Sequence, residues 1–202
     1  MVRADPRIER SESAIKRALL ARICRGSQFS ALTVSGIAGE AEVTRKTFYA
    51  RFGSLEQVVE DIVEGLFREL AAGIDDDLLE LPFSDNSLAL AFFRAYETHR
   101  DTLAPLLQRC PAALFIEPMT RVSSELLDRV LAVNGLPPID DAERAYLLGT
   151  TASVTHGVLS VWVDRDYAES PEQVASFIDL LLADGVNKVL TAGMHRRRTS
   201  CS

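Results

Sequence analysis

The sequence predicts an all-α protein with a small N-terminal module and a larger C-terminal domain. Proline and glycine divide the 202 residues into stretches whose apolar side chains recur every three or four positions, the spacing of one helical face. Runs of alternating β-branched residues between hairpin turns are not found. The length exceeds one average domain and falls short of two, so we expect a module of residues 1–53, a connecting helix over 54–71 and a helical domain of residues 72–202.

The composition excludes several classes of protein. Hydrophobic residues make up 47% and charged residues 25% of the chain, which is typical of a globular protein and not of a disordered or membrane-embedded one. The cysteines Cys24, Cys110 and Cys201 are too few for a disulfide framework and form no Cys-x-x-Cys pair, so we expect reduced thiols and no metal site. Residues Met1–Arg10 lack the apolar run of a secretory signal, which predicts a cytoplasmic protein.

The net charge of −7 conceals an uneven distribution. Residues 1–53 carry ten basic and five acidic side chains, a charge of +5, whereas residues 54–202 carry 12 basic and 24 acidic side chains, a charge of −12. A basic module on an acidic body is expected when only one end of a protein meets phosphate groups. A chance fluctuation of composition would give the same asymmetry, so charge alone leaves the function open.

Four helices are expected in the N-terminal part of the chain. In the first, Ile15, Leu19 and Ile23 recur at helical spacing. Two short helices follow, and a longer amphipathic helix then begins with a capping box formed by Ser54 and Gln57. The four helices are predicted at residues 11–25, 33–40, 44–50 and 55–70.

The C-terminal part begins with an acidic, proline-containing stretch. Residues 72–87 suit a solvated connection with room for one helical turn. Proline and glycine then delimit the helices that follow. We expect helices at 88–99 and 102–108, a break at Cys110–Pro111, a helix through 119–133 and a loop at 134–140.

Residues 145–163 form an unusual segment, because these 19 residues include no Asp, Glu, Lys or Arg. A membrane span is disfavoured by six hydroxyl or imidazole side chains and two glycines within the segment. We predict instead a helix that is buried on both sides, between its own domain and a second subunit.

A last helix over 171–190 starts with the N-cap Ser170 and with Pro171 at its first position. Two such helices would pair with their symmetry mates as a four-helix dimer interface.

The segment Leu32–Phe52 carries the sharpest functional signal. Thr33 is expected to cap one short helix and Thr44 a second, with a tight turn at Ala41–Val43 between them, which makes a helix-turn-helix. A helix that enters the major groove presents short polar or basic side chains near its N-terminus. The second helix offers such side chains at Arg45, Lys46 and Thr47.

Aromatic residues complete this second helix. Phe48 and Phe52 lie four residues apart and would anchor it to the core, whereas Tyr49 lies on another side, where its hydroxyl would donate to a phosphate oxygen. The alternative is a helical hairpin whose charged side chains are simply solvated.

These residues resemble the DNA-binding domain of the TetR family of transcriptional repressors. The likeness covers roughly Ser11–Phe67 and depends on the Thr-Val-x-x-Ile-Ala run at Thr33–Ala38, the Val-Thr-Arg-x-Thr-Phe-Tyr run at Val43–Tyr49 and Phe52. It implies that the helix beginning near Thr44 enters the major groove. It also implies six DNA-contacting residues, namely Thr33, Thr44, Arg45, Lys46, Thr47 and Tyr49.

The resemblance further implies an all-α C-terminal domain that forms a homodimer and encloses a ligand pocket. The dimer would use the last two long helices, here Asp141–Val163 and Pro171–Leu190. An apolar small-molecule site needs aromatic side chains and a few polar groups. The candidates, which plain core packing explains equally well, are Phe93, Tyr96, Phe115, His156 and Trp162.

The sequence departs from the family pattern at three places. Glu42 lies in the turn where glycine is common, and a left-handed residue other than glycine, Asn or Asp is strained. Gly36 and Gly39 lie inside the first short helix, at a cost of roughly 1 kcal/mol each against alanine. Leu55 stands where the family often has a phosphate-contacting lysine, so Arg51 or the N-terminal arginines would have to replace that contact.

The predicted function follows from the helix-turn-helix and from the lack of a catalytic motif. The Gly-x-Ser-x-Gly, phosphate-loop and His-Glu-x-x-His patterns do not occur, so we expect no enzyme and no cofactor. We predict a ligand-responsive repressor that binds a palindromic double-stranded DNA operator as a homodimer, since a two-fold axis dictates a palindrome. The alternative, suggested by Glu42 and the missing lysine, is a helix-turn-helix scaffold retained for small-molecule binding or protein interaction without specific DNA binding.

Overall fold

The computed structural model describes residues 6–83 and 87–199, and every regular element in these two ranges is helical. The predicted all-α fold is confirmed. The elements are, in chain order, α1 (Pro6–Cys24), the 3-10 turn η1 (Phe29–Ala31), α2 (Val34–Glu40), α3 (Arg45–Arg51), α4 (Leu55–Ala72), the 3-10 turn η2 (Asp76–Leu79), α5 (Ser87–Arg109), α6 (Ala113–Val133), α7 (Asp141–Asp164) and α8 (Pro171–Thr199).

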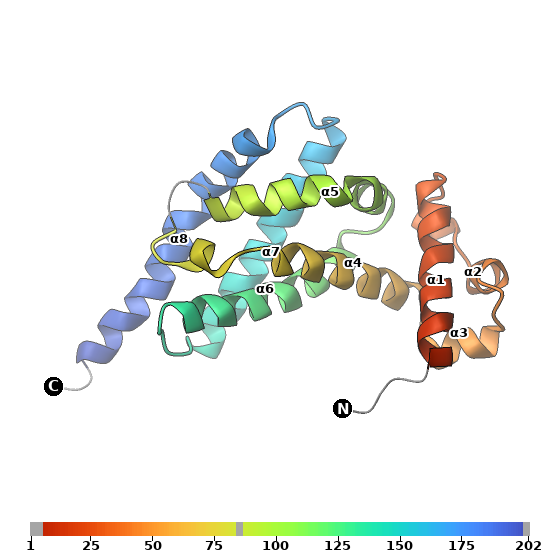
Figure 1. The fold of residues 1–202 in the computed structure, drawn as a ribbon, viewed down its shortest axis with the longest axis horizontal. Helices are drawn as coiled ribbons and strands as arrows, with labels where there is room; N and C mark the ends of the chain where they lie inside the picture. The colour runs from red at the N-terminus through yellow and green to blue at the C-terminus, as the bar shows by residue number, and fades with distance from the viewer. Residues whose placement is uncertain (1–5, 84–86, 200–202) are drawn as a thin grey trace.

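Helices α1, α2 and α3 pack together at one end of the molecule, and α4 runs from this end into the body built by α5 to α8 (Figure 1). The core of the end module consists of the apolar side chains that the helical spacing places on inner faces. Burial of one such side chain contributes about 1.5–3 kcal/mol. Ile15, Leu19, Ile23, Ile37 and Phe48 are all at most 1% exposed.

Side-chain caps define where the short helices begin. The hydroxyl oxygens of Thr33, Thr44 and Ser54 accept hydrogen bonds from the backbone N–H three residues later, at 3.1, 3.0 and 3.3 Å respectively. Gln57 adds a second hydrogen bond at the start of α4, because its Oε1 accepts at 2.6 Å from the N–H of Gly53, the residue before the N-cap Ser54. Each cap satisfies one of the amides that a helix start leaves unpaired, so these three boundaries are encoded locally.

Helix α5 is continuous, so the predicted break between residues 99 and 102 is wrong. Tyr96, Leu103 and Leu106 are fully buried and share one face, which continues across the polar residues between them. Pro105 lies inside the helix and has no N–H for the carbonyl of Asp101. The thiol of Cys24 on α1 approaches that carbonyl oxygen at 4.0 Å, so the proline leaves an acceptor facing the end module.

The stretch between α4 and α5 is not simply a solvated connection. Leu79 is fully buried and Ile74 is 3% exposed, so both belong to a core cluster of the body. The side-chain amide of Asn134, at the end of α6, accepts from the N–H of Leu81 and donates to the carbonyl of Leu79, both at 2.8 Å. The Asn134 side chain therefore pairs backbone groups of Leu79 and Leu81 that no helix or sheet pairs, and it holds the stretch against the body.

The long C-terminal helices leave one apolar face uncovered. Helix α7 buries Leu148, Ala152, Leu159 and Trp162, but Tyr146 is 79% exposed on the opposite side.

Helix α8 extends to Thr199, beyond the predicted end at 190, since no proline interrupts the sequence after its first residue. None of the helices in the described part of the chain is long and apolar enough to cross a membrane.

Candidate nucleic-acid interface and ligand cavity

The turn between α2 and α3 keeps the conformation that usually requires glycine. Glu42 has φ 54°, in the left-handed region. Its N–H donates to the carbonyl of Gly39 at 3.2 Å, and the N–H of Val43 donates to the carbonyl of Ala38 at 2.9 Å. These two bonds make a Schellman turn, in which a non-glycine residue costs about 1 kcal/mol. The glutamate therefore adds strain but does not change the path of the chain.

Helix α3 presents a basic outer surface and an aromatic inner surface. Arg45 and Lys46 are exposed in its first turn, and in the described part of the chain neither forms an ion pair. Phe48 is fully buried and holds the helix to the module, whereas Tyr49 is 51% exposed. The two rings pack edge to face, with centroids 5.6 Å apart. The anchored ring of Phe48 therefore also orients the exposed ring of Tyr49.

The threonines predicted to contact DNA already have a structural role. Thr44 caps α3 and its hydroxyl lies 2.9 Å from the hydroxyl of Thr47, one turn further on. Thr33 caps α2. All six predicted residues are thus on α2, α3 or their caps, and five of them are exposed while Thr47 is half-buried.

A clamp between α1 and α2 fixes the orientation of the helix-turn-helix. The carboxylate of Glu40 accepts from Arg22 Nε at 2.5 Å and from Arg25 Nη1 at 2.7 Å. These two hydrogen bonds hold the pKa of the Glu40 carboxyl below its usual value. The clamp also pairs two of the positive charges of the module, whereas Arg45 and Lys46 on α3 form no ion pair within the described residues.

The arrangement matches solved regulators along most of the chain. AlkX, a TetR family repressor from Dietzia sp. strain DQ12-45-1b implicated in the biodegradation of n-alkanes, superposes with a TM-score of 0.54 over 88% of this chain and 98% of that one, at 21% identity. The chain has the fold of the TetR family. A TetR family transcription regulator from Shewanella sp. PV-4 gives a TM-score of 0.53 over 87% of this chain and 97% of that one, at 17% identity.

Two further comparisons also match regulators of transcription. The activator of a dihydroxyacetone kinase operon, DhaS, has a TM-score of 0.50 and 19% identity, over 89% of this chain and 98% of that one. The uncharacterised HTH-type transcriptional regulator YxbF of Bacillus subtilis strain 168 is 27% identical over 172 residues. That match covers 83% of this chain and 43% of the relative, so the chain spans less than half of YxbF. No family model matches the sequence.

One position of the TetR pattern has changed its role. Leu55, where a lysine is common, is 9% exposed and belongs to the core cluster that links module and body. The nearby Arg51 is half-buried, and its Nε donates to Ser11 Oγ at 3.1 Å. This arginine therefore braces α3 against α1, and a phosphate would have to compete with the Ser11 hydroxyl for it.

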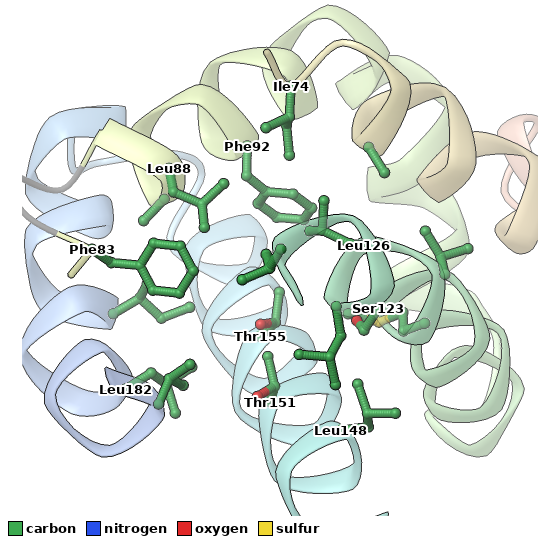
Figure 2. A pocket seen from close by; sticks show the side chains of 18 of the residues that line it. Ile74, Phe83, Leu88, Phe92, Ser123, Leu126, Leu148, Thr151, Thr155 and Leu182 are labelled. Carbon is green, nitrogen blue, oxygen red and sulfur yellow. The ribbon is translucent and has the colours of Figure 1, made fainter. Parts of the chain in front are cut away.

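The body encloses a cavity of about 220 Å³ between α4, α5, α6, α7 and α8. Figure 2 shows Phe83, Leu88, Phe92 and Leu126 around it, with the hydroxyls of the α7 threonines near its centre. Most of the lining is apolar, as in the usual small-molecule site of a protein. The polar lining residues in the described part of the chain are Ser123, Thr151, Thr155 and Asp179.

The five predicted pocket residues lie in two places. Phe93 lines the cavity. Trp162 and Tyr96 pack behind it as a buried cluster, with ring centroids 5.7 Å apart. Phe115 is fully buried in the core, and the half-buried His156 packs against it with ring centroids 5.2 Å apart. Neither residue lines the cavity.

His156 is half-buried, but its Nε2 atom is not exposed. This atom has no hydrogen-bond partner in the described part of the chain, and burial lowers the pKa of the imidazole. Sequence reasoning missed the lining residues Phe67, Thr151 and Thr155. The two threonines lie four residues apart in the uncharged segment and so share one face of α7, a signal that was available in the sequence.

An ion-pair network next to the cavity ties α4 to α6. Glu64 accepts from Arg68 Nη2 and from Arg121 Nε, each at 2.8 Å, and Arg68 also donates to Glu125 at 2.9 Å. Burial raises the pKa of Glu64, but these hydrogen bonds outweigh it and hold the pKa below the usual value. Helix α4 therefore lines the cavity with Phe67 and joins the ion-pair network with Glu64. A shift of α6 would move α4 through these ion pairs.

Proposed function

We propose that this protein is a transcriptional repressor that binds a palindromic operator as a homodimer and responds to a small molecule. The observation that carries the proposal is α3, a capped helix anchored by Phe48 whose exposed side chains include Arg45, Lys46 and Tyr49. Residues 1–53 would bind DNA, and residues 72–202 would bind the effector and the second subunit. The fold shared with AlkX, a repressor, supports this assignment.

The position of the six candidate residues supports DNA reading by the second helix of the pair. Side chains near the N-terminus of such a helix meet base edges, and Arg45 and Lys46 are in the first turn of α3. An arginine forms a bidentate contact with guanine, whereas the Tyr49 hydroxyl suits a phosphate oxygen. The remaining candidates, Thr33, Thr44 and Thr47, would contact the sugar-phosphate backbone beside them.

Exposed apolar side chains support the homodimer. Five of the seven large apolar residues exposed in the described part of the chain lie on α7 and α8, and α8 alone presents Phe177, Leu180 and Leu181, which are 54%, 80% and 53% exposed. A surface of this kind on a monomer marks an interaction site. Pairing it with a second copy would cover the outer face of α7, and the two-fold axis would place two recognition helices on successive half-sites.

The contacts of α4 support a response to a ligand. Phe67 and Ala71, near the end of this helix, line the cavity, whereas Leu55 and Val58, near its start, pack beneath the DNA-binding module. A molecule in the cavity would therefore touch the helix that carries the module. Repression is relieved if the filled cavity favours a spacing of the two modules that no longer matches the operator, because a ligand shifts an equilibrium toward the state it binds better.

The test is selection of bound fragments from host genomic DNA at ~150 mM salt, where surface charge attraction is largely screened. The native protein should recover a palindromic site that the Arg45→Ala/Tyr49→Ala double variant does not. Affinity for that site should fall linearly on a logarithmic scale as salt rises, while the preference over random DNA persists. Equal recovery of the same weak fragments by both proteins would favour a helix-turn-helix scaffold without specific DNA binding.

A further inference from the structure

The chemistry of the cavity lining restricts what it can hold. Of the 23 residues that line it, the described part of the chain provides one charged side chain, Asp179 on α8, and no lysine, arginine or histidine. An organic anion in this cavity would lose its water shell and meet no positive group. Burying a carboxylate without a partner costs several kcal/mol, so the lining disfavours acids and phosphate esters.

Two hydroxyls face the cavity without a hydrogen-bond partner. Thr151 and Thr155 project from α7 into the space between α5, α6 and α8 (Figure 2). Within the described ranges neither hydroxyl takes part in a hydrogen bond, whereas Thr120 on α6 bonds back to a carbonyl of its own helix at 2.7 Å. A hydroxyl supplies one donor and two acceptor positions, so the pair suits a single oxygen of a ligand.

The volume limits the size of the molecule. About 220 Å³ lies somewhat below the ~300–1,000 Å³ that is typical of ligand pockets, so a ligand smaller than most drug-sized molecules is expected. A bulkier ligand would have to displace lining residues such as Phe83, which precedes α5, or Leu88, in the first turn of α5.

We infer that the cavity binds an uncharged, mainly apolar molecule of this size whose oxygen atom hydrogen-bonds to Thr151 and Thr155, and that it excludes organic anions. The inference takes the cavity to be the effector site of the proposed regulator. Apolar atoms supply the affinity by leaving water, and the oxygen selects orientation through the two hydroxyls. Alcohols, ketones and similar neutral compounds form the class that meets both conditions.

The test compares three probes with one chain length and different head groups, 1-octanol, octanoate and octylammonium, by titration calorimetry of the full-length protein at pH 7.5. We expect 1-octanol to bind and octanoate to bind at least tenfold more weakly. Octanoate binding as tightly as 1-octanol would overturn the inference. So would octylammonium binding tenfold tighter than 1-octanol, because Asp179 would then set the ligand class.

Isosteric variants test the hydroxyls. Thr151→Val and Thr155→Val keep the shape of the side chain, and each should weaken 1-octanol about two- to tenfold, the loss expected for one neutral hydrogen bond. Ethylbenzene, which has no oxygen, is the matched control and should bind the variants as well as the native protein. Equal losses for both compounds in variants with an unchanged melting temperature would overturn the role of the hydroxyls.

The two proposals fail in different ways. If none of the probes binds while the ligand-free protein still recovers its palindromic site, the ligand class is wrong and DNA recognition stands. If 1-octanol binds with the expected selectivity but the protein recovers no specific site, the cavity chemistry stands and the regulator assignment fails.

Discussion

The indole of Trp162 meets the ring of Phe93 edge to face, with the two centroids 5.6 Å apart. Phe93 lines the cavity, whereas Trp162 lies behind it and donates through Nε1 to the carbonyl of Glu169 at 2.8 Å. The tryptophan is therefore separated from a bound ligand by a single aromatic ring. Both residues are at most 2% exposed, so neither has room to move independently of the other.

This contact predicts an optical signal for ligand binding. The chain has one tryptophan, so its fluorescence reports on this position alone. Saturating 1-octanol should change the intensity or the emission maximum of Trp162, and the Phe93→Leu variant should show a smaller change because the ring between ligand and indole is gone. A spectrum that stays constant while calorimetry records binding would contradict this relation between cavity and cluster.

Arg45 and Tyr49 are expected to play different parts in DNA binding. The Arg45→Ala variant should lose about 1–3 kcal/mol of discrimination between the selected site and a site with one changed base pair. The Tyr49→Phe variant should weaken both sites alike, since a phosphate contact carries no sequence information. Dissociation constants for the two sites at one salt concentration check this division. An equal loss of discrimination in both variants would refute it.

Leu180 is predicted to stabilise the dimer. It is 80% exposed in the single chain, and a two-fold axis would bury two copies of it. The Leu180→Glu variant should weaken association by about 3–6 kcal/mol per dimer, the transfer energy of two leucines. Sedimentation velocity measures the effect. The control is Val133→Glu, at a 38% exposed position on α6, which should leave association unchanged. A native protein that sediments as a monomer would contradict the proposed interface.

Gly39 offers a simple gain in stability. It lies inside α2, a Cβ built on it meets no atom within 4 Å, and its backbone is not in the left-handed region. The Gly39→Ala variant should raise the free energy of unfolding by up to about 1 kcal/mol. In the matched Gly36→Ala variant the new Cβ would lie 3.2 Å from the capping Oγ1 of Thr33, so the gain should be smaller or absent. Urea denaturation of both variants distinguishes the two positions.

His156 predicts a loss of stability at mildly acidic pH. Burial lowers its pKa in the folded state below the value of about 6.5 expected in the unfolded chain. The unfolded state therefore binds more protons between these two pKa values, and stability falls as pH drops through about 6.5 toward the lowered pKa. The melting temperature should be higher at pH 7.5 than at pH 5.5. The His156→Leu variant has no imidazole to titrate, so its melting temperature should differ less between the two pH values. If the difference in melting temperature is unchanged in this variant, other titrating groups cause it.

Local chemistry explains why much of the fold was accessible from sequence. The caps Thr33, Thr44 and Ser54 act within one turn of their own helices, and the apolar spacing of α1 and α4 depends only on neighbours three or four residues away. The same holds for the exposed start of α3, because a helix whose one face is anchored by Phe48 must present the opposite face. These features determine the helix-turn-helix and the candidate DNA-binding residues without reference to the rest of the chain.

Tertiary packing alone decided the cavity, the continuity of α5 and the role of Leu55. The cavity wall combines Phe67 of α4 with Thr155 of α7, which are far apart in sequence, so no local pattern reveals that they face one another. Aromatic residues are equally suited to core and pocket, which is why three of the five pocket candidates, Tyr96, Phe115 and Trp162, instead fill the core. Long-range packing sums many weak contacts, and its outcome depends on the shapes of all the helices together.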